Sequence, residues 1–155
     1  MLNIKNRKAF TMIELIFVIV VLGILASVAI PKLAATRTDA QVSKGRADVS
    51  SIRSGIMTQR QSKLITGNPN YIAGDEIDNA NGLFGGVLTY GITDSATAGH
   101  WTHSATAADV NSSKYMYNVA GEPVNFEYTR SGGIFTCSKT TGTDKAKAYC
   151  ANLID

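Results

Sequence analysis

An apolar run near the N-terminus is the feature that most constrains how this chain can fold. Residues 15–30, LIFVIVVLGILASVAI, contain no charged side chain, and 17 of the 22 residues from Phe10 to Pro31 are apolar. As a helix this stretch is about 30 Å long, which matches the hydrocarbon core of a bilayer. The chain has 155 residues and one run of this length, which excludes a many-span membrane protein.

Charge is distributed unevenly along the chain, although the formal net charge is only +3. Residues 1–9 carry three bases and no acid, and Glu14 is the one charged residue in 10–31. Residues 32–63 contain seven bases and two acids, whereas 64–155 contain five bases and nine acids. The small net charge and the 45% share of hydrophobic residues exclude wholesale disorder.

Three kinds of N-terminal segment combine a basic start with an apolar run. An ordinary secretory signal peptide would be cut after a small residue, here Ala29, and a plain single-span anchor would not be cut. In the third kind only the short leader is removed and the apolar helix stays. Glu14 distinguishes them, because a carboxylate costs about 2.5–3.5 kcal/mol at the centre of a membrane helix and less toward its end. A signal peptide or a plain anchor gains nothing from this residue, so Glu14 is a candidate functional residue.

The residues around Glu14 carry a resemblance to a known family. The octapeptide KAFTMIEL, residues 8–15, followed by the apolar run that ends at Pro31, resembles the N-terminal signature of type IV pilins and type II secretion pseudopilins. The resemblance implies that a prepilin peptidase cuts between Ala9 and Phe10 and then N-methylates Phe10. The family usually has Gly before the cut, so we expect Ala9 to slow processing.

The resemblance also implies roles in assembly for three residues of the apolar helix. Glu14 would approach the Phe10 ammonium group of a neighbouring subunit, and this pairing would offset much of the cost of desolvating both charges. Gly23 and Pro31 fall where the family places helix-weakening residues. The segment between them would extend locally as the subunit leaves the bilayer, although proline can also simply kink a membrane helix.

Helical character continues beyond Pro31. An apolar stripe is formed by Val42, Gly45, Val49, Ile52 and Ile56. We expect one helix from about Thr11 to Ile65, followed by the stop signal Gly67-Asn68-Pro69. The lysine and arginine residues of this helix have no aromatic residues between them that could stack on nucleobases, so nucleic acid is not an expected partner. The expected partners of this positive charge are the acidic parts of neighbouring subunits.

The rest of the chain is expected to form a globular head. Residues 67–113 are rich in Gly, Asn, Thr and Ala, and they predict a long connection with one short strand at 83–91. Alternating side chains within 114–137 predict three antiparallel strands, one face of which packs on the apolar stripe. The expected segments are the removed leader (1–9), the transmembrane and assembly helix (10–31), the amphipathic stem (32–66) and the head (67–155). The fold class is α+β and pilin-like: a long N-terminal helix packed against a small antiparallel sheet.

Two segments of the head contain residue types that bind metal ions. Residues 75–82 cluster oxygen ligands but lack the spacing of an EF-hand, so a solvated acidic turn is preferred to a Ca²⁺ site. His100 and His103 have no third ligand near them in sequence, and Trp101 between them is expected to be an exposed or partly packed loop residue. No metal site is therefore predicted.

Cys137 and Cys150 are the two cysteines of the chain. They resemble the pair that bounds the C-terminal loop of type IV pilins, which implies a disulfide and a disulfide loop over 137–150 in an oxidising periplasm. The alternative is two free thiols.

Function is expected to lie in assembly and not in catalysis. The chain has no G-x-S-x-G, P-loop, H-E-x-x-H or dinucleotide-binding motif, so neither an enzyme nor a cofactor is predicted. The resemblance implies a structural subunit of a type IV pilus or a type II secretion pseudopilus. The subunit would span the bacterial inner membrane once, with its head in the periplasm, and assemble into a helical filament that is periplasmic or extracellular.

The implied partners are copies of the chain, related pilin-like subunits, the prepilin peptidase, and an inner-membrane assembly platform with a cytoplasmic ATPase. Two alternatives stay open at this point. One is a secreted binding protein with an ordinary signal peptide cut after Ala29. The other, within the family, is a pseudopilin for DNA uptake in competence.

Overall fold

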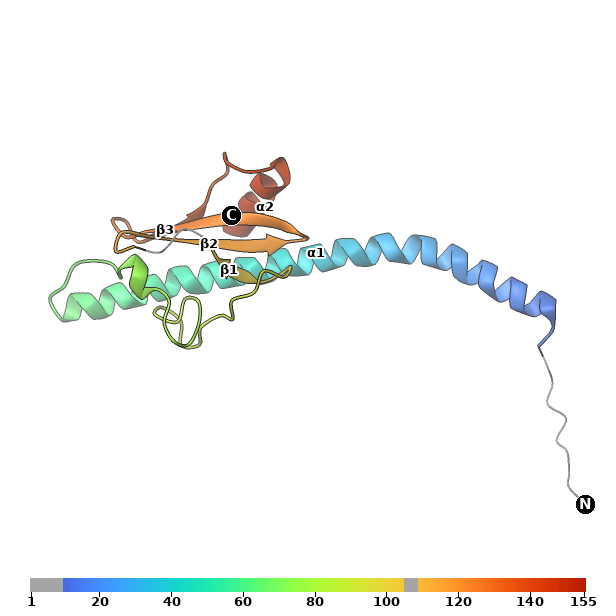
Figure 1. Ribbon diagram of the computed structural model, residues 1–155, viewed down its shortest axis with the longest axis horizontal. Helices are drawn as coiled ribbons and strands as arrows, with labels where there is room; N and C mark the ends of the chain where they lie inside the picture. The colour runs from blue at the N-terminus through green and yellow to red at the C-terminus, as the bar shows by residue number, and fades with distance from the viewer. Residues whose placement is uncertain (1–9, 105–108) are drawn as a thin grey trace, which may run out of the picture. The chain divides into compact units, whose positions relative to one another are not determined.

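The computed structural model describes residues 10–104 and 109–155 (Figure 1). In chain order the elements are α1 (Met12–Ile65), the 3₁₀ turn η1 (Gly74–Glu76), β1 (Trp101–His103), β2 (Ser112–Val119), β3 (Glu122–Thr129), β4 (Ile134–Cys137) and α2 (Asp144–Ile154). The chain divides into an N-terminal unit, Met1–Arg37, and a C-terminal unit, Thr38–Asp155. Ala9, one side of the predicted cleavage site, lies outside the described residues.

Helix α1 is continuous over 54 residues, and its bounds agree with the predicted helix to within one residue. Its start is capped by Thr11, whose Oγ1 accepts a hydrogen bond from the backbone N–H of Glu14 at 3.3 Å. Pro31 lies inside the helix without ending it.

The four strands form one antiparallel sheet in the order β1-β2-β3-β4. Ala120 and Gly121, both at positive φ (52° and 90°), make the tight turn between β2 and β3. Burial alternates along the strands, so one face of the sheet is apolar. That face carries Trp101, Tyr115, Tyr117, Val124, Phe126, Tyr128 and Phe135, all at most 2% exposed. The three strands predicted within 114–137 are confirmed as β2, β3 and β4.

Two predictions for residues 67–113 were wrong. The strand expected at 83–91 is a series of turns with a single bridge from Leu83 to Ile92, because Gly82 and Phe84 take positive φ values that a strand does not allow. The strand of this region is β1, and its Trp101 is fully buried instead of lying in a loop. The indole Nε1 of Trp101 donates to the carboxylate of Asp48 on α1 at 3.0 Å. This bond satisfies the one polar group of the indole ring, so the free-energy cost of burying Trp101 is small.

The C-terminal segment also differs from the loop predicted over 137–150, since it contains helix α2. Thr143 caps this helix by accepting a hydrogen bond from the N–H of Ala146 at 3.1 Å, and Asp144 lies in the first turn. Cys150 and Leu153 turn inward from α2 and are at most 1% exposed.

The core of the C-terminal unit joins α1 to the apolar face of the sheet. Val49, Ile52 and Ile56, three residues of the predicted stripe, are at most 1% exposed and belong to the same apolar cluster as the strand residues. Gly45 lies on the stripe as well, and a Cβ there would collide with the ring of Tyr117. The helix and the sheet therefore approach each other closely. The predicted α+β, pilin-like architecture is confirmed.

Candidate functional site

The N-terminal unit presents an apolar surface that no described residue covers. Its large hydrophobic side chains, from Phe10 to Leu33, are all exposed, with exposed fractions from 37% for Val21 to 80% for Phe10. Within the described part of the chain, α1 is the one helix long and apolar enough to cross a membrane. A surface of this kind needs lipid or other protein to cover it.

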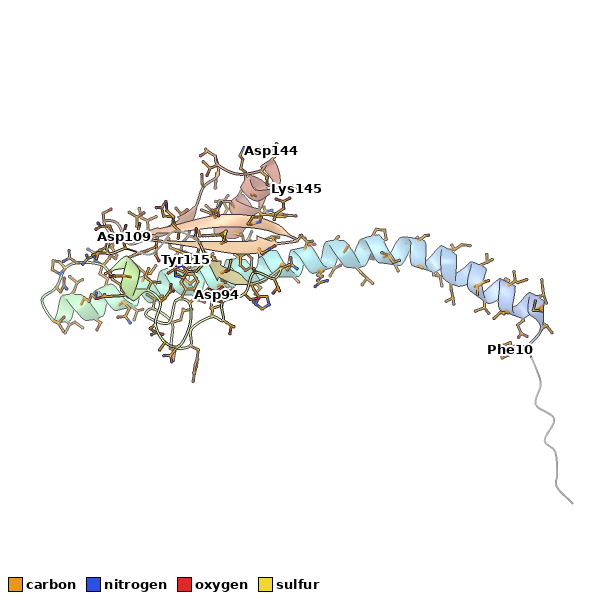
Figure 2. The ribbon with its side chains drawn as sticks, in the orientation of Figure 1. Phe10, Asp94, Asp109, Tyr115, Asp144 and Lys145 are labelled. Atoms are coloured by element: carbon orange, nitrogen blue, oxygen red, sulfur yellow. A yellow bond between two sulfur atoms is a disulfide. The ribbon has the colours of Figure 1, made fainter. Side chains whose placement is uncertain are left out.

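Phe10 precedes the first helical residue of α1 (Figure 2). Glu14 lies in the first turn of the same helix. The sequence from Thr11 to Glu14 is T-x-x-E, which is the pattern of a capping box. The bond from the Glu14 N–H to Thr11 forms half of this box. An acid in the first turn is also favoured by the helix dipole. Thr11 therefore caps the helix through the backbone N–H of Glu14, a helix start that was not predicted although the pattern is visible in the sequence.

Gly23 and Pro31 both lie inside α1, in the apolar part of the helix. A Cβ built on Gly23 meets no described atom within 4 Å, so the glycine is not needed for packing in the isolated subunit. Pro31 lacks an N–H and leaves the carbonyl of Ser27 without its helical donor. The hydroxyl of Ser27 donates to the carbonyl of Ile24 at 2.7 Å. The roles expected for Gly23 and Pro31 in assembly stay predictions.

The basic residues of the stem tie α1 to the rest of the C-terminal unit. Three of these side chains donate hydrogen bonds to backbone carbonyls. Lys44 donates to the carbonyl of Gly99 (2.6 Å), Arg46 donates from Nε to that of Asn152 (2.9 Å), and Arg53 donates to that of Phe135 (3.0 Å). The carbonyl of Asn152 lies in the last turn of α2, where a helix carries partial negative charge.

Two further stem bases bind side chains of the same unit. Lys63 forms an ion pair with Glu76 at 3.0 Å, and this bond, with help from the Ala73 N–H, lowers the pKa of Glu76. Arg60 contacts Tyr71. Five of the seven bases in residues 32–63 thus bind groups inside the chain, but only Lys63 pairs with an acid there. The contact expected between this basic stem and the acidic parts of neighbouring subunits stays a prediction.

Asp78 is the centre of a hydrogen-bonded cluster in the region predicted to be a solvated acidic turn. Its carboxylate accepts from the Phe84 N–H (2.7 Å) and the Tyr115 hydroxyl (3.1 Å), and it contacts Nε2 of His103 at 2.6 Å. Burial raises the pKa of Tyr115. The prediction was wrong for Asp78, because this residue fastens the loop to β1 and β2. In the two described ranges, no three His, Cys, Asp or Glu side chains come together as a metal site.

The structure joins Cys137 and Cys150 in a disulfide, with their Cα atoms 5.9 Å apart. The bond links β4 to α2, and both residues are buried, with exposed fractions of 6% and 0%. It therefore fixes α2 to the edge strand of the sheet, in a position that solvent does not reach.

Comparison with known proteins supports the N-terminal assignment. Residues 4–30 match a family model described as "Prokaryotic N-terminal methylation motif". The chain is 34% identical over 79 residues to a "Fimbrial protein" of Moraxella nonliquefaciens, and the match covers 51% of each chain. The chain therefore spans about half the length of this curated relative in the alignment. No solved structure matches the chain. Together with the fold, the motif and the relative confirm the resemblance to the type IV pilin-like family.

Proposed function

We propose that this chain is a structural subunit of a type IV pilus or of a related pseudopilus. Residues 10–31 hold the subunit in the inner membrane after the leader 1–9 is removed, and they later form the core of the filament. The C-terminal unit forms the filament surface. The proposed partners are copies of the chain and related subunits, together with the prepilin peptidase and an assembly platform driven by a separate ATPase.

The observation that carries the proposal is the uncovered apolar surface of α1, which runs from Phe10 to Leu33 and lies almost wholly within the methylation motif at residues 4–30. A soluble subunit would not leave Phe10, Phe17 and Leu25 more than 60% exposed. Lipid covers this surface in the stored subunit, and the same helices of neighbouring subunits cover it in a filament.

The charge pair proposed for assembly joins two subunits. Cleavage before Phe10 creates an ammonium group four residues from Glu14. Within one subunit Glu14 already lies in the first turn of α1, so the local cap and the contact between subunits use different groups of the same residue. The backbone N–H of Glu14 serves the cap, and its carboxylate is left for the neighbour's ammonium group.

A set of three variants tests the role of Glu14. Glu14→Val and Glu14→Gln both remove the charge, and we expect both to abolish filaments while the chain still enters the membrane. Thr11→Ala is the matched control, because it removes the capping hydroxyl and keeps the charge; it should still assemble. Filaments are measured by electron microscopy and by immunoblotting of the sheared fraction, and insertion by membrane fractionation. Normal filaments from Glu14→Val would refute the pairing.

Mass spectrometry of the mature N-terminus tests processing. We expect a methylated Phe10 as the first residue, with some uncut chain because Ala9 replaces the usual glycine. A chain that begins at Ile30 would instead establish a secreted protein with an ordinary signal peptide cut after Ala29. That cut falls inside the continuous helix α1, which makes it the weaker alternative.

Between pilus and pseudopilus, the fimbrial relative and the disulfide favour a pilus. A role in DNA uptake has less support, because most bases of the stem are already used within the chain. Electron microscopy of a deletion strain, with assays of secretion and of transformation, separates the three.

A further inference from the structure

A hollow of about 350 Å³ in the C-terminal unit collects basic side chains without an acid that neutralises them. It lies where the last turns of α1 meet the turn after β3. Its polar lining comes from Arg60, Asn70, Tyr71, Asn111, Arg130 and Ser131. Neither arginine forms an ion pair with any described residue.

Tyr71 holds both arginines in place. The guanidinium of Arg60 stacks over the Tyr71 ring, with Cζ 4.1 Å from the ring centroid, and its Nη1 donates to the Tyr71 hydroxyl. Arg130 donates from Nε to the Tyr71 carbonyl at 3.3 Å. The ring itself lies against Gly133, where φ is 62° and a Cβ would collide with it. Both guanidinium groups are therefore fixed before a ligand arrives, and such preorganisation lowers the cost of binding.

The nearby acids are already used by other groups. Glu76 pairs with Lys63, and the charge of Arg130 is only the smallest contribution to its lowered pKa. Asp109 accepts from the backbone N–H groups of Asn111 and Ser112 at 2.6 and 2.7 Å. The lining of the hollow itself contains two arginines and no acid, so it carries an excess of positive charge.

Arg60 also has an unsatisfied donor. Its Nε is buried and has no hydrogen-bond acceptor among the described residues. A buried donor of this kind is costly, and a positive group left without a counter-charge favours an incoming anion. Of the ten N–H bonds that two guanidinium groups carry, the contacts with Tyr71 use one from each arginine.

We propose that this two-arginine hollow binds a small oxyanion, either a carboxylate or a phosphate group. The planar fork of a guanidinium matches both groups. The amides of Asn70 and Asn111 and the hydroxyl of Ser131 add neutral donors around it. Two sources supply this chemistry: a free anion, or a side-chain carboxylate of a second copy of the chain. The inference does not depend on the proposed filament function.

Calorimetric titration of the full chain in non-ionic detergent micelles tests the site. The probes are inorganic phosphate and succinate, each added at constant ionic strength set with NaCl. We expect saturable binding that Arg60→Gln and Arg130→Gln each weaken by about 10-fold or more. Arg130→Lys keeps the charge but loses the fork, so it should weaken binding less than Arg130→Gln. Lys145→Gln on α2 (Figure 2) removes an equal charge from an exposed position and should leave binding unchanged.

Sedimentation of the same samples identifies the source of the anion. If a second copy supplies the carboxylate, the chain self-associates, and both phosphate and Arg130→Gln reduce the association while Lys145→Gln does not. Trp101 fluorescence checks that Arg60→Gln is folded, and Arg130→Gln provides an independent variant if it is not. The proposal is overturned if wild type shows neither saturable anion binding nor arginine-dependent association. It is equally overturned if Lys145→Gln weakens binding as much as Arg130→Gln. Because unassembled chain is measured, a failure of filament assembly leaves this result standing.

Discussion

The two halves of α1 are one helix by hydrogen bonding but differ in what covers their apolar side chains. In the N-terminal unit the apolar residues surround the helix and every large one is exposed. In the C-terminal unit an apolar stripe faces the sheet, and its residues Val49, Ile52 and Ile56 are buried. A helix that is apolar on all sides can be covered by lipid or by other subunits, whereas a helix with one apolar stripe packs that stripe against another element of the same chain. Substitutions in the two halves should therefore change different properties.

Truncating one isoleucine in each half should give the largest contrast. Ile52→Ala leaves a cavity at a position with 0% exposure and should lower the free energy of unfolding by about 2–5 kcal/mol. Ile19→Ala truncates a side chain with 58% exposure and should change the free energy of unfolding by less than about 0.5 kcal/mol. Urea unfolding in non-ionic micelles, followed by the fluorescence of the buried Trp101, measures both. Equal losses would mean that the two halves share one core.

The sequence was informative wherever one periodic signal ran over many residues. The stripe from Val42 to Ile56 predicted both the helix and its buried face, and the alternation within 114–137 predicted three strands. The motif around Glu14 could be identified from the sequence alone. These signals are local, because each depends only on spacing along the chain.

The elements that were missed depend on contacts between distant residues. Strand β1 has three residues, too few for a visible alternation. Trp101 is buried among aromatic rings that are distant in sequence, and Asp48, 53 positions away, accepts its N–H. The two-arginine hollow joins Arg60 to Arg130 through Tyr71, which no spacing rule reveals. Helix α2 could have been predicted, since Thr143 and Asp144 form an ordinary helix start that the expected disulfide loop obscured.

Alkaline pH should destabilise the C-terminal unit selectively. Burial, together with the charge of Asp48, raises the pKa of Tyr117 to about 12, and burial raises the pKa of Tyr128 to about 12 as well. An unfolded tyrosine has a pKa of about 10, so between pH 10 and 12 the unfolded chain loses protons that the folded chain keeps. The stabilisation is therefore complete below pH 10 and is lost as the pH rises to 12, by up to about 2–3 kcal/mol for each tyrosine.

The N-terminal unit provides the internal control for this pH dependence, because residues 10–37 contain no tyrosine. Unfolding free energies measured at pH 9, 10, 11 and 12 should change little up to about pH 10 and fall from there to pH 12, while the helical circular dichroism of the micelle-bound N-terminal half persists. Tyr90→Phe should not change the curve, since Tyr90 is 86% exposed. A stability that is constant up to pH 12 would contradict the burial of the two phenols.

A pair of Gly→Ala substitutions should give the smallest but sharpest contrast. In both halves alanine improves helix propensity by up to about 1 kcal/mol. Gly45→Ala should nevertheless lower the free energy of unfolding by about 1–3 kcal/mol, because the new methyl group would collide with Tyr117 and Leu153 in the core. The methyl group added by Gly23→Ala would contact no described atom, so this substitution should leave the free energy of unfolding unchanged or raise it. Thermal unfolding of the full chain in micelles measures both changes.

The same pair separates folding from assembly. If helix weakening at Gly23 serves the filament, Gly23→Ala will reduce assembly with no loss of stability, whereas Gly45→Ala will reduce assembly only in proportion to the folded fraction. If Gly23→Ala assembles normally, the glycine has no role in filament formation. Any local extension of the helix would then depend on Pro31, which lacks the backbone N–H.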